Sequence, residues 1–523
     1  MALYNFPFPD VFKKSYANSV EYPINMAYMM PITSPEFLEG LNKRLSEMST
    51  QLFAETEKDV EIAWRDLGVG HGLDLKKLNI RSSEKLTEMM GFNIDNSTSA
   101  ITSYQHDPQC RFIYLCGDTS LSALDVTQPM FTRILTFHQI MPSYLDFVMA
   151  FGRQEKPTDL RFSSFKKQVS LAPSARMLEI LGLGRSGQQY QLCYNLKHIA
   201  GKSGRGYSIR QAAVHHQFDV VNGKTLWVVT AGRRDLQERY KHLTEKGAKA
   251  ENKSFETPVE CFRSSLAAHS MFCAWAIEDW RWYIKLFETD LEEATKLTVI
   301  GPRGIGEDHQ KYQQGDLQTL QRHEEEVHET LAALEANMCV FGSLYKFYSG
   351  LKKNKDFPLR HDVAEYLDLF TDHMEDSMSD IEHLVQRAST LLKTIDGRKQ
   401  LVVQYFQNQS IENMEKMNSN MEKESILVRI VTIVTLIYLP ATFVSYQNGP
   451  NDSGSFSYTA IVRWLQIALP LTAVTLLLAW IWNHRAKQQL RNAEKTKQRP
   501  TWFFRARKPF LSLPLYNKKP GSP

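Results

Sequence analysis

The sequence predicts an α+β protein with an N-terminal mixed α/β cytosolic domain, a long helical stalk and two C-terminal transmembrane helices. Two nearly uncharged apolar segments, 426–446 and 461–482, stand near the C-terminus. Between about 105 and 235, apolar residues alternate along several segments, which indicates strands. From about 255 they recur at 3-4 spacing, which indicates helices. The expected regions are a cytosolic domain (1–250), a stalk of long helices (251–425), a transmembrane hairpin (426–482) and a basic, disordered cytosolic tail (483–523).

The N-terminal region combines helix and strand patterns. Helical patterns occur at 35–48 and 84–90, and a segment rich in Phe, Leu and Met predicts a buried helix at 129–153. Apolar runs predict strands at 111–115 and 190–199. All six cysteines precede the first long apolar segment and none forms a CxxC pair, so we expect reduced cysteines in the core of a cytosolic domain.

A β-hairpin around Asn222-Gly223 is the clearest local prediction. Asn-Gly between two alternating runs favours a type I′ turn, because both central residues of that turn need positive φ. The alternating residues are Val214, His216, Phe218 and Val220 before the turn, and Leu226, Val228 and Thr230 after it.

Helical patterns follow a polar linker at 233–254. Thr257-Pro258-Val259-Glu260 predicts a capping box, which opens a helix with one apolar side as far as Phe287. A Gly- and Pro-containing break at 301–306 ends this helix. Apolar residues at 317–348 then predict a long helix packed against another helix, as in a coiled coil, with Glu324 as the one interruption of its seam.

A third helix begins near Asp362 and meets no proline before Pro440. The sequence therefore predicts one helix of roughly 85 residues that runs through the first apolar segment. A kink in this helix is most favoured at Gly397, because glycine lowers the stability of a helix by about 1 kcal/mol relative to alanine.

Both apolar segments are long enough to cross a bilayer, because about 20 residues match a hydrocarbon core of about 30 Å. Eleven Lys and Arg residues and one acid, Glu494, follow Trp482, although the whole chain has a net charge of only +4. A short tail this basic stays on the cytoplasmic or matrix side. We therefore expect an integral, two-span membrane protein with both termini on that side, in an organelle that the sequence does not specify.

The order of these parts resembles the CorA-type transporters of magnesium and other divalent metals, in their divergent, fungal-like branch. Pro440-Ala441-Thr442-Phe443 matches a Pro-x-Thr-Phe run in the first span of that family. Gly449-Pro450-Asn451 stands where the family carries Gly-Met-Asn, and the layout matches over roughly residues 255–485. Proline removes an N–H and fixes φ near −65°, so this loop differs from the family's, while its asparagine is kept.

The resemblance implies that the first span lines an ion pathway, and its hydroxyl-bearing residues fall on one 3-4 stripe. Such a stripe can line a water-filled path, with Val428 and Leu439 as dry constrictions. Alternatively, the hydroxyls bond to their own i−4 carbonyls or to a neighbouring helix. The predicted pore and selectivity residues are Gly449, Asn451, Thr442, Leu439, Thr435, Thr432, Val428 and Ser425.

Mg²⁺ suits such a path, because it binds water tightly and neutral oxygens, such as a ring of Asn451 amides, can select it while hydrated. Two spans per chain cannot enclose a channel, so a homo-oligomer is required, and the resemblance implies a pentamer. The expected partners are copies of this chain, membrane lipid and a divalent metal ion. We expect no nucleic-acid partner and no cofactor, with Mg²⁺ as the transported ion and as a regulatory one.

Two charged segments have open interpretations. An acidic stretch could hold regulatory Mg²⁺ between subunits, or it could be a solvated helix face. The basic tail could lie on anionic lipid, or it could serve topology alone. The candidate regulatory ligands are Asp362, Glu365, Asp368, Asp372, Glu375 and Asp376.

We find no catalytic motif in the sequence and do not expect an enzyme. Gly182-Leu183-Gly184-Arg185-Ser186-Gly187 fits GxGxxG, but it leads into an alternating strand instead of a helix, which argues against a dinucleotide site. The prediction is a channel-like transporter of Mg²⁺ or a related divalent ion. The alternative is a non-conducting, membrane-anchored scaffold or binding protein that keeps the architecture and has lost the filter.

Overall fold

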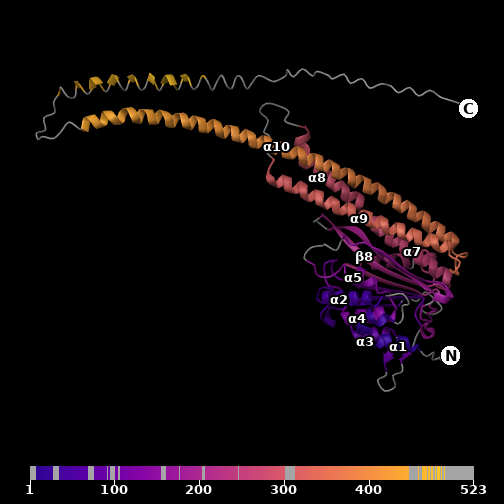
Figure 1. The fold of residues 1–523 in the computed structure, drawn as a ribbon. Coiled ribbons are helices and arrows are strands. Elements are labelled where there is room, and N and C mark those ends of the chain that lie inside the picture. The colour runs from indigo at the N-terminus through magenta and orange to yellow at the C-terminus, as the bar shows by residue number, and fades with distance from the viewer. Residues whose placement is uncertain are drawn as a thin grey trace, which may run out of the picture. The chain divides into compact units, whose positions relative to one another are not determined.

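The computed structural model describes residues 8–27, 34–68, 76–90, 92–94, 101–103, 106–154, 161–175, 177–202, 206–245, 247–300 and 312–446, and separate positions between 458 and 488. The chain divides into two compact units, Met1–Phe406 and Gln407–Pro523. In the first unit, a twisted sheet lies between two groups of helices (Figure 1). This arrangement confirms the predicted mixed α/β domain followed by long helices.

The main sheet of the first unit contains both predicted strands, 111–115 as part of β5 and 190–199 as part of β7. Neighbouring strands are antiparallel except β5 and β9, which run parallel. A separate hairpin joins β3 (Phe92–Ile94) and β4 (Ile101–Ser103). In spatial order the strands of the main sheet are β2 (Lys76–Ile80), β1 (Ile62–Leu67), β5 (Cys110–Cys116), β9 (Thr225–Ala231), β8 (Gly206–Asp219), β7 (Gln189–Lys202) and β6 (Phe165–Ser170).

The N-terminal helices cover one face of this sheet, where they enclose a core with Trp64, Ile113 and Val228 (Figure 1). The predicted helices at 35–48 and 84–90 are confirmed as α2 and α3. Pro35 occupies the first turn of α2, where a missing N–H costs nothing. The helices of this group are α1 (Asp10–Ala17), α2 (Pro35–Leu52), α3 (Ser83–Met90), α4 (Gln128–Phe137) and α5 (Tyr144–Val148).

The single buried helix predicted at 129–153 is wrong in its continuity. Its residues are largely buried, as predicted, but they form the two short helices α4 and α5. Gln139 adopts a φ of 54°, which an α-helix cannot contain, and Pro142 has no N–H to continue the ladder. Apolar composition predicted the burial of this segment but not its break.

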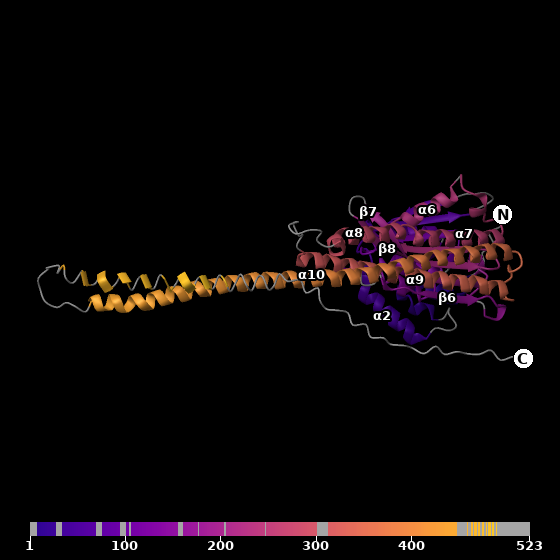
Figure 2. The same ribbon diagram turned by 90° about the horizontal axis from the view of Figure 1, so that it is seen from above.

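Longer helices lie side by side over the other face of the sheet (Figures 1 and 2). They are α7 (Pro258–Ile277), α8 (Trp280–Ile300), α9 (Gln314–Lys353) and the first part of α10 (Ala364–Tyr446). The predicted polar linker at 233–254 is wrong, because it contains the helix α6 (Asp235–Thr244), whose Leu236 and Tyr240 are buried. Two apolar residues a turn apart are enough to dock a helix that is otherwise polar.

Five cysteines are buried as expected, whereas Cys339 is exposed.

The capping box at Thr257 is confirmed. The Thr257 hydroxyl accepts from the Glu260 N–H at 3.2 Å, and the Glu260 carboxylate accepts from the Thr257 N–H at 3.2 Å. The sequence predicted that the helix opened by this capping box continues to Phe287, and this prediction is wrong. It breaks between α7 (Pro258–Ile277) and α8 (Trp280–Ile300), because Asp279 has a φ of 67°.

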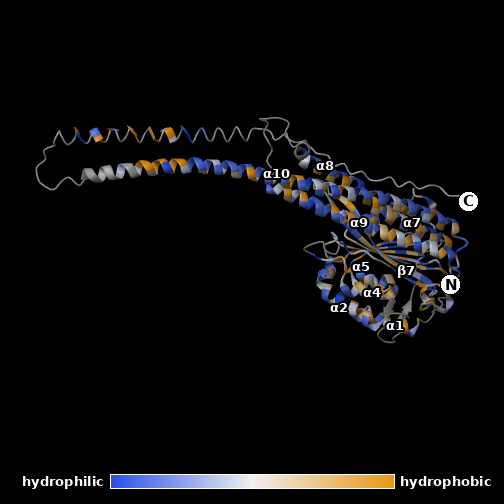
Figure 3. Ribbon diagram, turned by 45° about the horizontal axis from the view of Figure 1, so that its top comes forward, coloured by the Kyte–Doolittle hydropathy of each residue, from blue (hydrophilic) through white to orange (hydrophobic). Residues whose placement is uncertain are grey.

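The long helix predicted at 317–348 is confirmed as α9 (Gln314–Lys353), and the core of its seam is buried. Glu324, the one charge in that seam, forms an ion pair with Lys399 of α10. A second ion pair joins Arg387 of α10 to Glu288 of α8, with N–O distances of 2.8 and 2.6 Å. Hydrophobic and hydrophilic residues are interspersed along these helices (Figure 3). The hydrophobic Leu320, Val327 and Leu334 of α9 are buried.

The predicted hairpin is confirmed, but its type I′ turn is wrong. Strands β8 and β9 pair as far as Phe218 and Thr225, which leaves a longer loop between them. Gly223 has a φ of 70°, whereas Asn222 is not at positive φ. The Asp219 carboxylate accepts from the N–H groups of Val221 (3.0 Å) and Asn222 (2.9 Å), and this side chain shapes the loop instead.

Helix α10 (Ala364–Tyr446) confirms the predicted long helix in length and position, and it continues without interruption through Gly397. It contains the first predicted span, 426–446, where hydrophobic residues gather along the helix (Figure 3). Within the part of the chain that the structure describes, no helix has the length and apolar character that crossing a membrane requires. The two-span topology therefore stays a prediction, and much of 461–482 and the whole of 491–523 lie outside the described residues.

Candidate functional site

The predicted pore stripe lies on the C-terminal part of α10. Ser425, Val428, Thr432 and Thr435 are exposed there, and the unbroken helix places them on one face. Leu439 and Thr442 belong to the same helix, but their side chains lie outside the described part. Gly449 and Asn451 also lie outside the described residues. Pore lining therefore remains a prediction for all eight residues.

Two threonines of the stripe, Thr432 and Thr435, bond to their own helix. The Thr432 hydroxyl donates to the Val428 carbonyl at 2.7 Å, and the Thr435 hydroxyl donates to the Val431 carbonyl at 2.6 Å. This is the i−4 bonding that the sequence left open as an alternative. Once its hydrogen is committed in this way, a hydroxyl can only accept from a group that faces it. Both oxygens are thus fixed as acceptors on one side of α10.

The acidic stretch is an exposed face at the start of α10. Asp362 precedes the helix, and the other five candidate ligands lie on its first turns with exposed side chains. Asp368 is held by Lys352 of α9, whose Nζ lies 2.5 and 2.7 Å from the two carboxylate oxygens. Among the described residues of one chain, no three His, Cys, Asp or Glu side chains gather to hold a metal ion. A regulatory ion between subunits stays a prediction.

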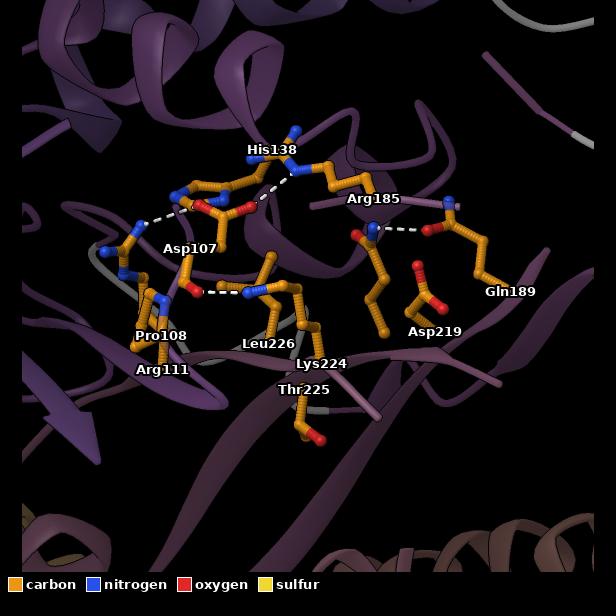
Figure 4. Close-up of a pocket in the computed structure, with 11 residues that line it drawn as sticks. Asp107, Pro108, Arg111, His138, Arg185, Gln189, Asp219, Lys224, Thr225 and Leu226 are labelled. Carbon is orange, nitrogen blue, oxygen red and sulfur yellow. Dashed lines mark hydrogen bonds and ion pairs between the residues drawn. The ribbon is translucent and has the colours of Figure 1, made fainter. Parts of the chain in front are cut away.

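A buried cluster of charges that the sequence analysis missed lies at the ends of the central strands of the sheet (Figure 4). Arg111 on β5 binds Asp66 on β1 through Nε (2.8 Å) and Nη2 (2.9 Å). Asp107 lies between two arginines, 3.4 Å from Nη1 of Arg111 and 2.6 Å from Nε of Arg185. Burial alone would raise the pKa of Asp107, but these two guanidinium charges outweigh it and hold that pKa below its usual value.

Lys224 enters the same cluster from the loop between β8 and β9. Its ammonium group donates to the Asp107 carbonyl (Figure 4), and burial lowers its pKa. The lysine side chain passes close to Gly184, where a Cβ would lie 2.7 Å from Cε of Lys224. Gly184 has a φ of 71°, so the backbone conformation favours glycine at this position.

His138 completes the lining of a cavity of about 30 Å³ between these side chains (Figure 4). Burial and the two nearby arginines lower the pKa of His138 well below its usual value, so its ring is neutral. Nη2 of Arg185 and Nε2 of His138 are buried without a hydrogen-bond partner.

Two features of the sequence belong to this cluster, although neither was assigned to it from the sequence alone. Arg111 opens an apolar strand, and the Gly182–Gly187 run brings Arg185 to a glycine turn. The pairing of Asp66 with Arg111 depends on strands β1 and β5 lying side by side, and neither sequence segment specifies that neighbour.

Comparison with known proteins gives one family. A family model described as CorA-like transporters matches residues 14–299, more than half of the chain. None of the curated proteins matches this chain.

Several solved structures are similar to it at low identity. The CorA magnesium transporter of Methanocaldococcus jannaschii is 12% identical over 80% of this chain and 97% of its own, with a TM-score of 0.38. The full-length CmaX protein is 14% identical over 82% and 97%, with a TM-score of 0.30. The ZntB cytoplasmic domain of Vibrio parahaemolyticus is 9% identical over 65% and 98%, with a TM-score of 0.32.

Proposed function

Because this chain belongs to the family of CorA-like transporters, we propose that it carries divalent metal ions across a membrane, with Mg²⁺ as the ion that suits its residues best. The family match over residues 14–299 is the observation that carries this proposal. The family is one of transporters, so no catalytic role is assigned to any residue. The proposed path follows the C-terminal part of α10 and ends at Asn451.

Hydroxyl oxygens fixed as acceptors favour a hydrated cation. Thr432 and Thr435 have committed their hydrogens to the carbonyls of Val428 and Val431. Water bound to a cation turns its hydrogens outward, so it donates to oxygens of this kind. Mg²⁺ dehydrates reluctantly and keeps several waters in protein sites. A face of neutral acceptors can therefore guide hydrated Mg²⁺ without carboxylates that would bind it tightly.

A path on the surface of one helix requires several copies of that helix around it. In the proposed assembly, symmetric copies of the chain place their Thr432 and Thr435 oxygens around one axis, and a ring of Asn451 amides forms the outer mouth. Membrane potential drives entry, since each elementary charge that crosses gains about 2.3 kcal/mol per 100 mV, and a divalent ion carries two charges.

The test is ion flux into proteoliposomes that contain the purified full-length chain and a Mg²⁺-sensitive dye. We expect uptake that increases with an inside-negative potential. Thr435→Val keeps the shape of the side chain and removes its oxygen, so it should lower the initial rate several-fold. Thr390→Val is the matched control, because Thr390 lies on the same helix in the first unit and makes the same i−4 bond at 2.9 Å. Equal rates for the two variants would remove Thr435 from the path.

A second candidate function is a membrane-anchored scaffold that does not conduct ions. The observation that favours it is Pro450, which replaces the central residue of the family's Gly-Met-Asn run and leaves Asp452 as the one acid just beyond it. The same flux assay separates the two functions. Full incorporation into the membrane with no uptake of Mg²⁺ or Zn²⁺ at any potential would support the scaffold and exclude transport.

A further inference from the structure

We propose that copies of α10 pack in parallel between Ile411 and Thr435, and that Glu424 of one copy forms an ion pair with Arg429 of its neighbour. All of these residues belong to the second unit, Gln407–Pro523. This interface rests on the symmetric assembly of the proposed function, but it forms whether or not ions pass through that assembly.

A strict seven-residue repeat runs along one face of this part of α10. Its four large apolar side chains are between 52% and 63% exposed in one chain. Among the positions outside the repeat from 410 to 424, only Met417 is apolar. A repeat of seven keeps one face of a helix turned toward a partner helix that coils around it. With Ile411 at position a, the a residues are Ile411, Asn418, Ser425 and Thr432, and the d residues are Met414, Met421, Val428 and Thr435.

Lipid alone does not account for this apolar face. The repeat begins before the apolar segment 426–446, in a stretch whose other positions carry Glu, Lys, Asn and Ser. Exposed apolar side chains that gather on one face of such a stretch mark a contact with protein. A second copy of α10 presents the same repeat, and copies around one axis with the same membrane orientation run parallel.

Asn418 is the polar member of the repeat ahead of the apolar segment. It is exposed on α10 and occupies an a position. One asparagine at such a position specifies the register of a coiled coil, because its amide meets the amide of the neighbouring helix only when the two helices are aligned. Asn418 therefore favours copies that are in register over copies that are staggered.

Arg429 has no acidic neighbour within one chain of the predicted hairpin. It is exposed, and none of the side chains three or four positions away on its helix is acidic. The other apolar segment, 461–482, contains no Asp or Glu. The one charge of the segment 426–446 thus has to find its counter-ion outside its own chain or in the lipid headgroups.

The heptad register supplies that counter-ion. Glu424 occupies position g, and Arg429 occupies the next position e. In a parallel coiled coil, a side chain at g lies beside the next e position of the neighbouring helix, and opposite charges there set the partner and its orientation. Glu424 of one copy therefore meets Arg429 of the next copy.

The first experiment tests the interface by cross-linking the purified full-length chain. Cys339→Ser provides the background, because the other five cysteines are buried. Met421→Cys at position d should join copies through a disulfide under a mild added oxidant, several-fold faster than Lys423→Cys. Lys423 is the matched control, since it is exposed at position f on the outer side of the helix. Equal rates for the two variants would overturn the interface.

The second experiment tests the ion pair by exchanging its charges. Glu424→Arg and Arg429→Glu should each lower the temperature at which the oligomer dissociates in detergent, because each places like charges side by side. The double variant restores opposite charges and should regain most of the loss. Glu412→Arg is the matched control, since it makes the same change at the exposed outer position b.

Glu424→Arg provides the answer if Arg429→Glu does not insert into the membrane. An effect of Glu424→Arg no larger than that of Glu412→Arg would overturn the ion pair and leave Arg429 to the lipid headgroups. Uptake of Mg²⁺ without cross-linking at Met421→Cys would contradict this interface alone, whereas cross-linking without uptake would contradict transport alone.

Discussion

Three buried histidines of the first unit, His215, His216 and His269, have lowered pKa values. Nδ1 of His269 lies 2.7 Å from the Tyr194 hydroxyl, and its Nε2 lies 3.0 Å from Nδ1 of His216. A doubly protonated ring can only donate, so a proton on either histidine removes one acceptor from this chain. Burial lowers the pKa of His269 to about 3 and that of His215 to about 3. Burial, followed by the neighbouring His269 and His215, also lowers that of His216.

We predict that stability falls as the pH drops below about 6.5. The unfolded chain then binds protons that the folded histidines refuse, so each depressed histidine costs roughly 1.4 kcal/mol per pH unit down to its folded pKa. Asp125, whose pKa burial and Asp118 raise to about 6, acts in the opposite direction by one proton. Denaturant unfolding between about pH 7 and pH 4 measures the slope.

His269→Gln should reduce that slope by about one proton, and His328→Gln is the control at an exposed position of α9. An unchanged slope in His269→Gln would show that His269 is not among the groups that titrate on unfolding.

At the proposed outer mouth, Asn451→Ala is predicted to abolish the selectivity for Mg²⁺ while the oligomer still assembles. The amide supplies the neutral oxygens that would face the hydrated ion, and alanine supplies none. Competition between Mg²⁺ and Ca²⁺ uptake in proteoliposomes measures selectivity, and size-exclusion chromatography measures assembly. Unchanged flux and selectivity would remove Asn451 from the mechanism.

At the scale of the elements, the side chain of Asn337 on α9 makes the hydrogen bonds to β7 that a neighbouring strand would otherwise make. Strand β6 pairs with β7 only from Gln189 to Tyr194. Among the described residues, no strand pairs with this edge of β7 beyond Tyr194. Asn337 of α9 fills this position, because its Oδ1 accepts from the Lys197 N–H at 2.8 Å and its Nδ2 donates to the Lys197 carbonyl at 2.7 Å. Its amide thus reproduces the pair of bonds that an antiparallel strand would make.

Asn337→Leu is therefore predicted to destabilise the first unit by roughly 2–4 kcal/mol. Leucine keeps the branched arrangement of side-chain heavy atoms but leaves a buried N–H and a buried carbonyl of β7 unpaired, each costing about 1–3 kcal/mol. Denaturant unfolding measures the loss. The control is Ser343→Ala on the same helix, whose hydroxyl bonds only its own helix at Cys339 (2.8 Å). A loss no larger than that of the control would contradict the role assigned to Asn337.

Helices were more predictable than their interruptions. The cap at Thr257 and the seam of α9 follow from local spacing, and both are confirmed. The breaks at Gln139 and Asp279 were missed, because each depends on one non-glycine residue at positive φ that tertiary packing holds in place. The charge cluster around Asp107 was missed for a related reason, since its members come from segments far apart in the sequence.

At the scale of the whole molecule, the family was recognisable from two different parts of the chain. The sequence resemblance rested on layout from 255 onward and on the motif at Pro440, whereas the family model matches residues 14–299. On the face of the sheet opposite the N-terminal helices, a second core of the first unit extends from the sheet across α7, α8, α9 and α10. The helices beyond residue 251 therefore pack on the domain that precedes them.

We predict that the purified chain is an oligomer in detergent, because the two predicted spans of one chain cannot enclose a path. The resemblance to CorA-type transporters implies that it contains five copies. Light scattering coupled to chromatography should give a protein mass five times that of one chain. A monomer or a dimer would contradict the proposed path, since neither can surround a central axis with α10. Mutation of the acidic face at Asp372 and Asp376 to asparagine should leave this mass unchanged if that face is only solvated.

The amide of Asn337 also limits how α9 can slide along the sheet. One turn away in either direction, α9 presents Ala333, Leu334, Val340 and Phe341, and none of these can satisfy the open edge of β7. A displacement of α9 by one turn would place an apolar side chain against the N–H and the carbonyl of Lys197 and leave both without a hydrogen bond. Such a displaced position of α9 is therefore unfavourable. We therefore expect the sheet and α9 to move together, with the two bonds of Asn337 to Lys197 kept.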